Sequence, residues 1–322
     1  MADSMEMTND EIQDILDIFN AKYDTEISEL KPLQHETLSH FGNLSSDVVC
    51  MLPTGYGKSL VYELLPVFLG KKFNKSACVI VIEPLNVIIN QQMTKLGPDA
   101  VTIKNKMSEE ELLALQTSTY MYSHPENIID NKEVYKILMS DVVQNKVCVI
   151  VVDEAHCIID WGDEYRPMFK EIKQLKSVLP RAKILALSAT LSKDGQKEIS
   201  RQLLMKNVKV VCSKPTRNNV SLIVVTRPPL TTSVSTKDTY DYVYVPLLCE
   251  LKSKGQEFSL TLVYASGNMD WVCYGFELAC KILGTDMFVG DQEAKNQRVA
   301  MYHSCIEKED EVKYFMPIYI MV

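Results

Sequence analysis

The chain lacks several features that would assign a protein to a class at once. None of its nine cysteines stands in a CxxC pair, so we expect neither a disulfide framework nor a zinc site, and scattered cysteines are typical of a reducing compartment. The longest apolar runs, such as Val147–Val152, are far shorter than a membrane span. The opening residues MADSMEMTND are acidic and polar, so we expect no secretory signal.

An excess of basic residues is also missing. The 34 Lys and Arg residues are outnumbered by 42 Asp and Glu residues, which gives a net charge of −8. Phosphate contacts supply most of the affinity for nucleic acid, so this balance argues against a protein that coats nucleic acid. It is compatible with a local groove of Lys and Arg. The length of 322 residues allows two domains with cores of their own.

Apolar, β-rich runs alternate with helical patterns along the first two thirds of the chain. Capping-box pairs, Thr8 with Glu11 and Ser108 with Glu111, mark two helix starts. The alternation predicts an α/β fold in which a parallel sheet is covered on both faces. The predicted strands are Asp47–Leu52, Ala77–Ile82, Val147–Val152 and Lys183–Ser188, and the predicted helices are Ser59–Leu69, Ser108–Leu115 and Phe169–Leu179.

A seam near Cys212–Val220 predicts two domains, residues 1–216 and residues 217–322. The second alternation has about 100 residues, which is short for an α/β domain that covers both faces of its sheet. Its predicted strands are Ser221–Val225, Thr261–Ala265, Met287–Val289 and Val299–Tyr302, and its predicted helices are about Tyr240–Lys254 and Asp270–Leu283.

The sequence LPTGYGKS, from Leu52 to Ser59, follows a predicted strand and precedes a predicted helix. Gly55 and Gly57 let the backbone curl, so that its N–H groups and the helix N-terminus point at one place that suits a polyphosphate. Lys58 would reach the β and γ phosphates, and the Ser59 hydroxyl would bind Mg²⁺. The alternative is an ordinary glycine-rich turn.

The sequence DEAH, Asp153–His156, follows the strand Val147–Val152. Asp153 would hold Mg²⁺, and Glu154 would orient or deprotonate the attacking water. Read alone, two acids after a strand are also typical of a helix cap. Ser188 and Thr190 of the sequence SAT end the next strand, where they can hydrogen-bond toward His156 or form a plain turn.

Two further segments supply candidate binding residues. HCIIDWGDEYRP places Trp161, Tyr165 and Arg166 after the acids, and exposed aromatic rings beside an arginine stack on single-stranded bases. A Trp packed in the core under a surface loop is the alternative. Gln34, in LKPLQ, carries an amide that suits the edge of adenine.

Taken together, these segments resemble those of RecQ-family DNA helicases of superfamily 2. LKPLQ is similar to the family's adenine-reading motif, with Lys31 where Arg is usual. VIEPLNVIINQQM and YSHPENI resemble two motifs that help to bind DNA, and ALSAT, RNNV and TLVYASG resemble later ones.

The resemblance implies two RecA-like domains, the second one incomplete, and ATP- and Mg²⁺-dependent 3′-to-5′ unwinding of DNA in repair or recombination. It implies a nuclear location, or a cytoplasmic one for a bacterial source, and no membrane association. The implied site residues are Lys31, Gln34, Pro53, Thr54, Gly55, Tyr56, Gly57, Lys58 and Ser59 for ATP, Lys58, Asp153 and Glu154 for catalysis, Ser59 and Asp153 for Mg²⁺, His156, Ser188 and Thr190 for coupling, and Trp161, Tyr165 and Arg166 for DNA.

The chain also departs from the family pattern. Asp160 stands where the family has Gln, and Asp163 where it has His. The family's later motifs are missing, including the one whose arginine reaches the γ-phosphate, as are its zinc-binding and winged-helix regions. Because such an arginine contributes roughly 10³–10⁵ in rate, we expect the chain to bind ATP and to hydrolyse it poorly by itself. The alternatives are a truncated relative that binds ATP and DNA without unwinding, and a different phosphate-loop enzyme such as a kinase.

Overall fold

The structure is a computed structural model, and it describes residues 7–124, 127, 131–160, 166–213, 220–224, 226, 236–264, 269–293, 296–302 and 318–321. The chain divides into two compact units, Met1–Asn218 (unit 1) and Asn219–Val322 (unit 2). The domain boundary expected between residues 216 and 217 falls outside the described residues and stays a prediction. In the described part, no helix is both long and apolar enough to cross a membrane.

Unit 1 is built on a seven-stranded sheet with the strand order β3-β4-β2-β5-β6-β1-β7. Every neighbouring pair is parallel, which confirms the predicted α/β class. The strands are β1 (Val48–Met51), β2 (Cys78–Ile82), β3 (Ala100–Ile103), β4 (Tyr120–Ser123), β5 (Val147–Val152), β6 (Lys183–Ser188) and β7 (Lys209–Cys212).

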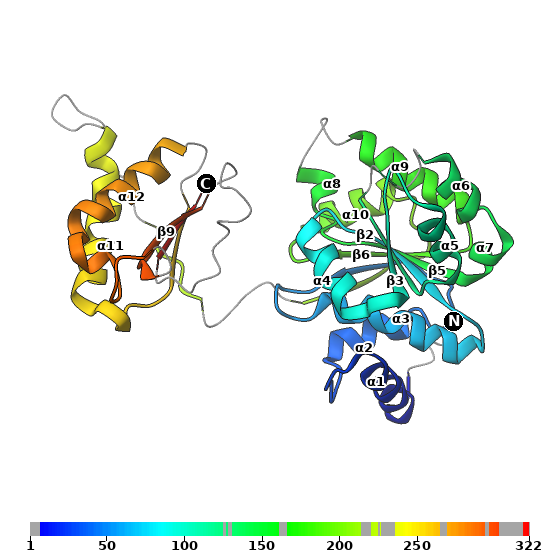
Figure 1. Ribbon diagram of the computed structural model, residues 1–322. Coiled ribbons are helices and arrows are strands. Elements are labelled where there is room, and N and C mark those ends of the chain that lie inside the picture. The colour runs from blue at the N-terminus through cyan, green and yellow to red at the C-terminus, as the bar shows by residue number, and fades with distance from the viewer. Residues whose placement is uncertain are drawn as a thin grey trace. The chain divides into compact units, whose positions relative to one another are not determined.

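Helices cover both faces of this sheet, as Figure 1 shows. Side chains alternate along each strand, so Val48 and Cys50 of β1 enter one core cluster while Val49 and Met51 enter the other. Helices α1–α4 belong to the first cluster, and α5, α6, α7, α9 and α10 to the second. The helices are α1 (Asn9–Tyr23), α2 (Pro32–Ser39), α3 (Lys58–Phe73), α4 (Asn86–Leu96), α5 (Glu109–Thr117), α6 (Lys132–Leu138), α7 (Asp141–Lys146), α8 (Cys157–Asp160), α9 (Arg166–Val178) and α10 (Lys193–Gln202), with a 3-10 turn η1 (Gly97–Asp99).

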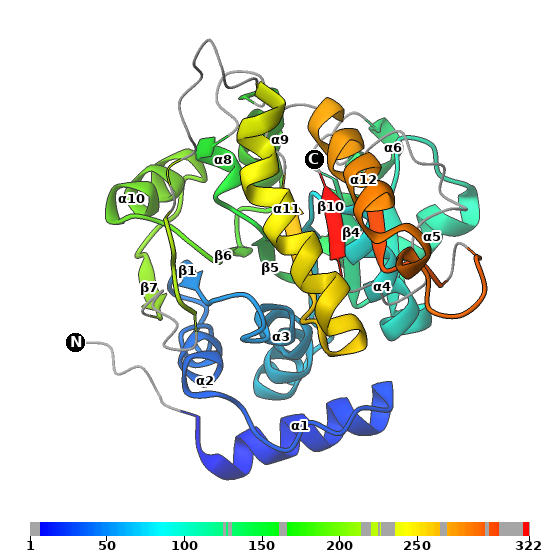
Figure 2. The same ribbon diagram turned by 90° about the vertical axis from the view of Figure 1, so that its left-hand side faces the viewer.

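Both predicted capping boxes are present. The Thr8 hydroxyl accepts the Glu11 N–H at the start of α1, and the Ser108 hydroxyl accepts the Glu111 N–H at the start of α5. These side chains bond N–H groups that have no partner inside the helix. Helices α1 and α2 both pack against α3 (Figure 2).

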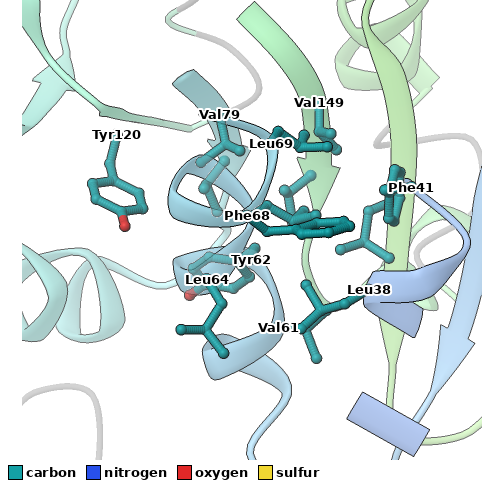
Figure 3. Packing of buried hydrophobic residues seen from close by; sticks show 14 of the residues in the cluster. Leu38, Phe41, Val61, Tyr62, Leu64, Phe68, Leu69, Val79, Tyr120 and Val149 are labelled. Carbon is teal, nitrogen blue, oxygen red and sulfur yellow. The ribbon is translucent and has the colours of Figure 1, made fainter. Parts of the chain in front are cut away.

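Helix α3 is buried along most of its length, and this fixes the loop that precedes it. Phe68 and Leu69 of α3 pack near Val79 of β2 and Val149 of β5 (Figure 3). Leu38 of α2 belongs to the same core cluster. Burying one such side chain stabilises the fold by about 1.5–3 kcal/mol. The loop between β1 and α3 is therefore held at both ends by the core.

Unit 2 contains a three-stranded parallel sheet with the order β8-β10-β9. Helices α11 and α12 lie side by side against it (Figure 1), with Tyr244, Val272 and Val299 in their common core. The elements are α11 (Thr236–Lys254), η4 (Gly255–Glu257), β8 (Thr261–Tyr264), α12 (Met269–Leu283), η5 (Gly284–Met287), β9 (Val299–Tyr302) and β10 (Ile318–Met321).

Two predicted strands are wrong. Residues 221–224 of the predicted strand Ser221–Val225 form no strand, and Leu222 is 90% exposed. In place of Met287–Val289, a 3-10 turn ends at Met287, and Phe288 makes a single antiparallel bridge to Gln297. Both segments have β-prone side chains, but within the described residues neither one has a neighbouring strand to complete a ladder.

Candidate functional site

The loop between β1 and α3 has the shape that its glycines predict. Gly55 and Gly57 have positive φ angles of 80° and 91°, and Gly57 is the N-cap of α3. The loop begins beside β6, because the Leu52 N–H donates to the Ser188 carbonyl (3.1 Å). The first N–H groups of a 16-residue helix thus point at the loop, where a phosphate would complete their hydrogen bonding.

Lys58 begins a series of contacts that joins three predicted motifs. Its Nζ lies 3.5 Å from Oε1 of Glu154, and Oε2 of Glu154 lies 3.2 Å from Nδ1 of His156. That nitrogen is also 3.3 Å from the Ser188 Oγ. Ser188 Oγ in turn accepts the Thr190 N–H (3.3 Å). The expected contact between SAT and His156 is therefore made through Ser188.

Asp153 lies at the carboxyl end of β5 with only 8% of its surface exposed. Its Oδ1 accepts the Glu154 N–H at 2.8 Å. Burial raises the pKa of Asp153 to about 6, against the opposing effect of that hydrogen bond. A cation bound at this carboxylate would offset the cost of burying its charge.

Glu83 is an acid of the site that the sequence reading missed. It follows β2 as Asp153 follows β5, and the two strands are neighbours. It is 1% exposed, and burial, together with the charge of Asp153, raises the pKa of Glu83 to about 8. The sequence does show an acid directly after the predicted strand Ala77–Ile82. The resemblance to RecQ-family helicases, however, assigned the segment VIEPLNVIINQQM to DNA binding.

Gln34 stabilises the loop between β1 and α3 through hydrogen bonds. Its Oε1 accepts the Lys31 N–H (2.9 Å), and its Nε2 donates to the carbonyls of Tyr56 (3.1 Å) and Gly57 (3.0 Å). Lys31 Nζ donates to the Tyr56 carbonyl as well (3.0 Å). The predicted contact between Gln34 and an adenine stays a prediction, and it would replace some of these bonds.

The two segments expected to bind DNA lie next to each other. Nε2 of His124 is 2.7 Å from Oδ1 of Asn86, which joins the loop after β4 to the start of α4. Leu85 and Val87 beside this contact are 52% and 65% exposed. Trp161 and Tyr165 lie outside the described residues, and Arg166 is the first residue of α9.

A hollow of about 870 Å³ opens beside His156 and Thr190, with Met51, Gln196 and Cys212 also in its wall. Two of the three residues predicted to couple, His156 and Thr190, therefore border this hollow. Among the described residues, no group of three or more His, Cys, Asp and Glu side chains could hold a metal ion by itself.

Comparisons with known proteins agree with this geometry. A family model described as DEAD/DEAH box helicase matches residues 31–199. The chain is 32% identical over 202 residues to the mouse protein named bifunctional 3'-5' exonuclease/ATP-dependent helicase WRN, covering 61% of this chain and 14% of that protein. It is 30% identical over 171 residues to the ATP-dependent DNA helicase RecQ of Haemophilus influenzae, covering 50% and 26%. These relatives confirm the resemblance, although the chain spans about a quarter or less of their length.

Solved structures show the same fold. The DUF1998 helicase MrfA bound to DNA superposes with a TM-score of 0.63 at 15% identity, covering 94% of this chain and 42% of that one. The helicase Lhr of Mycobacterium smegmatis, bound to ssDNA and AMP-PNP, gives a TM-score of 0.61 at 14% identity, covering 94% and 41%. At this level of identity, the likeness concerns the fold alone.

Proposed function

This chain belongs to the DEAD/DEAH box helicase family, and from that premise we propose that it binds Mg-ATP and couples ATP hydrolysis to movement along DNA. The observation that carries the proposal is the series of contacts from Lys58 through Glu154 and His156 to Ser188. These contacts run unbroken from the phosphate loop to SAT. A change in the contacts of Lys58 with the phosphates can therefore affect Ser188 at the end of β6.

The residues present fit Mg-ATP. Gly55 has open space around the position of a Cβ, so a phosphate can approach its backbone. The Ser59 hydroxyl and the buried Asp153 carboxylate are the oxygen ligands that Mg²⁺ prefers. When bound, Mg²⁺ would neutralise charge on the β and γ phosphates.

Lys58 and Glu154 would change partners when ATP binds. A phosphate in the loop competes with Glu154 for the Lys58 ammonium group. Glu154 Oε1 is then available to accept a hydrogen bond from a water molecule, while His156 continues to hold Oε2. Water attack forms a new P–O bond, breaks the bond to ADP and passes a proton to Glu154 or to the released phosphate.

We further propose that the nucleic acid is DNA and that the activity is of the RecQ type, with 3′-to-5′ polarity and a role in repair or recombination. The names of the relatives, the adjacent segments at Asn86 and His124, and the predicted stacking residues Trp161 and Tyr165 support this assignment. A eukaryotic source would place the protein in the nucleus, and a bacterial one in the cytoplasm.

The proposal is tested by titrating the chain with a fluorescent ATP analogue in the presence of Mg²⁺. Lys58→Ala should weaken binding at least about tenfold, because the ammonium group meets the β and γ phosphates. Lys71→Ala is the matched control, since Lys71 lies on the same helix and pairs with Asp14. Equal binding by both variants and the unmodified chain would contradict the proposed nucleotide site.

Turnover is measured with and without single-stranded DNA, and unwinding on duplexes with a 3′ or a 5′ tail. DNA-stimulated hydrolysis with preference for the 3′ tail supports the helicase assignment. Nucleotide binding with no turnover under any condition would favour the alternative of a binding protein.

A further inference from the structure

The strands of unit 1 begin at the edge of the sheet opposite to the phosphate loop. Because every neighbouring pair is parallel, the seven strands share one amino edge and one carboxyl edge. The phosphate loop, Asp153 and the segments at Asn86 and His124 all follow strands, so they belong to the carboxyl edge. The amino edge takes no part in the proposed function.

Basic residues are concentrated at this amino edge. Five neighbouring strands, in the order β2, β5, β6, β1 and β7, are entered by residues 74–77, 144–146, 180–182, 43–47 and 205–208. These segments and the first residues of β6 and β7 contain Lys75, Lys146, Arg181, Lys183, Lys206 and Lys209, but one acid, Asp47. In the whole chain, by contrast, 42 acidic residues outnumber 34 basic ones.

Two of these cations meet at the segment that enters β5. Lys75 Nζ donates to the Asn145 carbonyl (3.3 Å), and Arg181 Nη1 donates to Oδ1 of the same Asn145 (3.4 Å). Lys75 precedes β2 and Arg181 precedes β6, the strands on either side of β5. The two charges therefore lie next to each other, although they are far apart in the sequence.

Two more cations meet at the segment that enters β1. Lys183 Nζ donates to the Ser45 carbonyl (3.4 Å), which also accepts from Nδ2 of Asn207 (3.4 Å), the residue after Lys206. We call Lys75, Arg181, Lys183 and Lys206 the basic row. Neighbouring strands lie about 4.8 Å apart, so the row follows the edge from β2 to β7 over roughly 19 Å.

The charges of the basic row are not neutralised within the described residues. No carboxylate of that part of the chain lies within 4 Å of their charged nitrogens. Asp47 is 1% exposed, and its two oxygens accept the backbone N–H groups of Ile184 and Lys206. An ammonium group has three donors and a guanidinium group five, so each cation can bond a ligand as well as its carbonyl or amide partner.

We propose that the basic row binds the phosphate backbone of duplex DNA, as a second surface apart from the segments at Asn86 and His124. Lys, Arg, Asn and Ser are residue types that contact phosphates without reading sequence, and the row contains Asn145, Ser45 and Asn207 between its cations. At about 3.4 Å per base pair, its length matches roughly five or six base pairs. This inference goes beyond the proposed function, which uses the opposite edge.

The residues around the row favour duplex DNA over other anionic partners. Binding of single strands depends on aromatic rings on which bases stack. Phe73, close to the row, is 39% exposed, but Lys75 Nζ lies over its ring, 5.9 Å from the centroid. An acidic protein segment would need apolar anchors at the centre of its interface, where the row has Asn145 and Ser45.

The experiment measures the affinity for a fluorescein-labelled, blunt-ended DNA duplex by anisotropy, without nucleotide and over a range of salt concentrations. The variant Lys75→Gln, Arg181→Gln, Lys206→Gln removes three exposed charges of the row. It should bind at least about tenfold more weakly at about 50 mM salt. Because each phosphate contact contributes about 0.9 to the slope of log affinity against log salt, the slope should become less steep by about 2 to 3.

The matched control removes the same net charge from unit 2. The variant Lys252→Gln, Lys254→Gln, Lys281→Gln changes three exposed lysines that pair with acids of α11, η5 and α12. Its duplex affinity should stay within about twofold of that of the unmodified chain, since paired surface charges contribute little to phosphate binding.

A second variant keeps the charges of the row. Lys75→Arg, Arg181→Lys, Lys206→Arg should bind the duplex within about threefold of the unmodified chain. Each single Gln variant should lower the salt slope by about 0.9, which tests the row even where the triple variant does not fold. Affinity for the fluorescent ATP analogue should be unchanged in every variant, because the phosphate loop lies at the other edge.

The outcomes distinguish this inference from the proposed function. Equal duplex affinities and salt slopes in the unmodified chain and the Gln variants of the row would overturn the inference, as would an equal loss in the control from unit 2. Absence of duplex binding by the unmodified chain overturns it too. Tighter binding of labelled polyglutamate than of the duplex, lost in the triple Gln variant, would assign the row to an acidic protein segment instead. Failure to bind the ATP analogue contradicts the proposed function alone.

Discussion

Two buried carboxyl groups, those of Glu83 and Asp153, lower the stability of the folded chain when they ionise. Burial raises their pKa values to about 8 and about 6, so the unfolded chain gives up these protons first. Stability from each group is fully present at low pH, and it is lost as pH rises through the folded pKa. Ionisation of Glu83 and Asp153 in the folded chain therefore lowers its free energy of unfolding.

Asp153→Asn is expected to stabilise the chain while it abolishes turnover. Below pH 3.8, the ordinary pKa of Asp, the variant and the unmodified chain should have similar stabilities. The difference in unfolding free energy between the variant and the unmodified chain should grow up to about pH 6. Above that pH it should stay constant, on the order of 3 kcal/mol. Urea unfolding across this pH range measures it. Asp194→Asn, on the exposed surface of α10, should show no such growth, and a flat difference for Asp153→Asn would contradict the argument.

Gly55 and Gly57 provide a matched pair of loop substitutions. Both have positive φ, so Ala at either position should cost about 1 kcal/mol of unfolding free energy. At Gly57 a Cβ would also lie 2.6 Å from Nε2 of Gln34, whereas at Gly55 nothing lies within 4 Å. Gly57→Ala should therefore be the more destabilising, measured by urea unfolding, and equal losses would show that Gln34 moves away freely.

At the residue scale, the sequence names several residues that the structure places in one series of contacts, while their roles stay predictions. Lys58, Glu154, His156 and Ser188 were all named, and the structure brings them together. Glu83 was missed because its position near Asp153 depends on the pairing of β2 with β5, which no local pattern reveals. The roles assigned to Trp161, Tyr165 and Arg166 stay predictions.

At the scale of elements, long buried strands were the easiest to find. Val147–Val152 and Lys183–Ser188 were predicted with the bounds that β5 and β6 have. Strands β3, β4 and β7 were missed, and each has only four residues. Strand β1 is equally short, but it leads into the recognisable sequence LPTGYGKS. Short strands owe their conformation mainly to their neighbours.

The start of α4 offers a test of the DNA-binding surface. Val87→Asp adds a negative charge to an exposed apolar position and should lower affinity for single-stranded DNA by about tenfold. Val142→Asp is the control, because Val142 is 55% exposed on α7, which leads into the opposite end of β5. Fluorescence anisotropy measures the affinity of both variants for single-stranded DNA. Equal losses of affinity would show that DNA binds elsewhere on the chain. Nucleotide binding should be unchanged in each variant.

At the scale of the whole molecule, the described residues of the nucleotide site all belong to unit 1. A fragment of residues 1–218 should therefore fold and bind a fluorescent ATP analogue with Mg²⁺ within about threefold of the affinity of the full chain. Weak binding by a well-folded fragment would show that residues beyond 218 contribute to nucleotide affinity.

The strand that leads into the phosphate loop is made long before its neighbours on the ribosome. Val48 of β1 pairs with Leu185 of β6 and with Lys209 of β7. At about 5–20 residues per second, roughly 10 to 30 s separate the synthesis of β1 from that of β7. Until β6 has been made, β1 is an apolar strand without either neighbour, and it is exposed to chaperones and to aggregation. The loop that would hold ATP can thus take its final form only when nearly all of unit 1 has been synthesised.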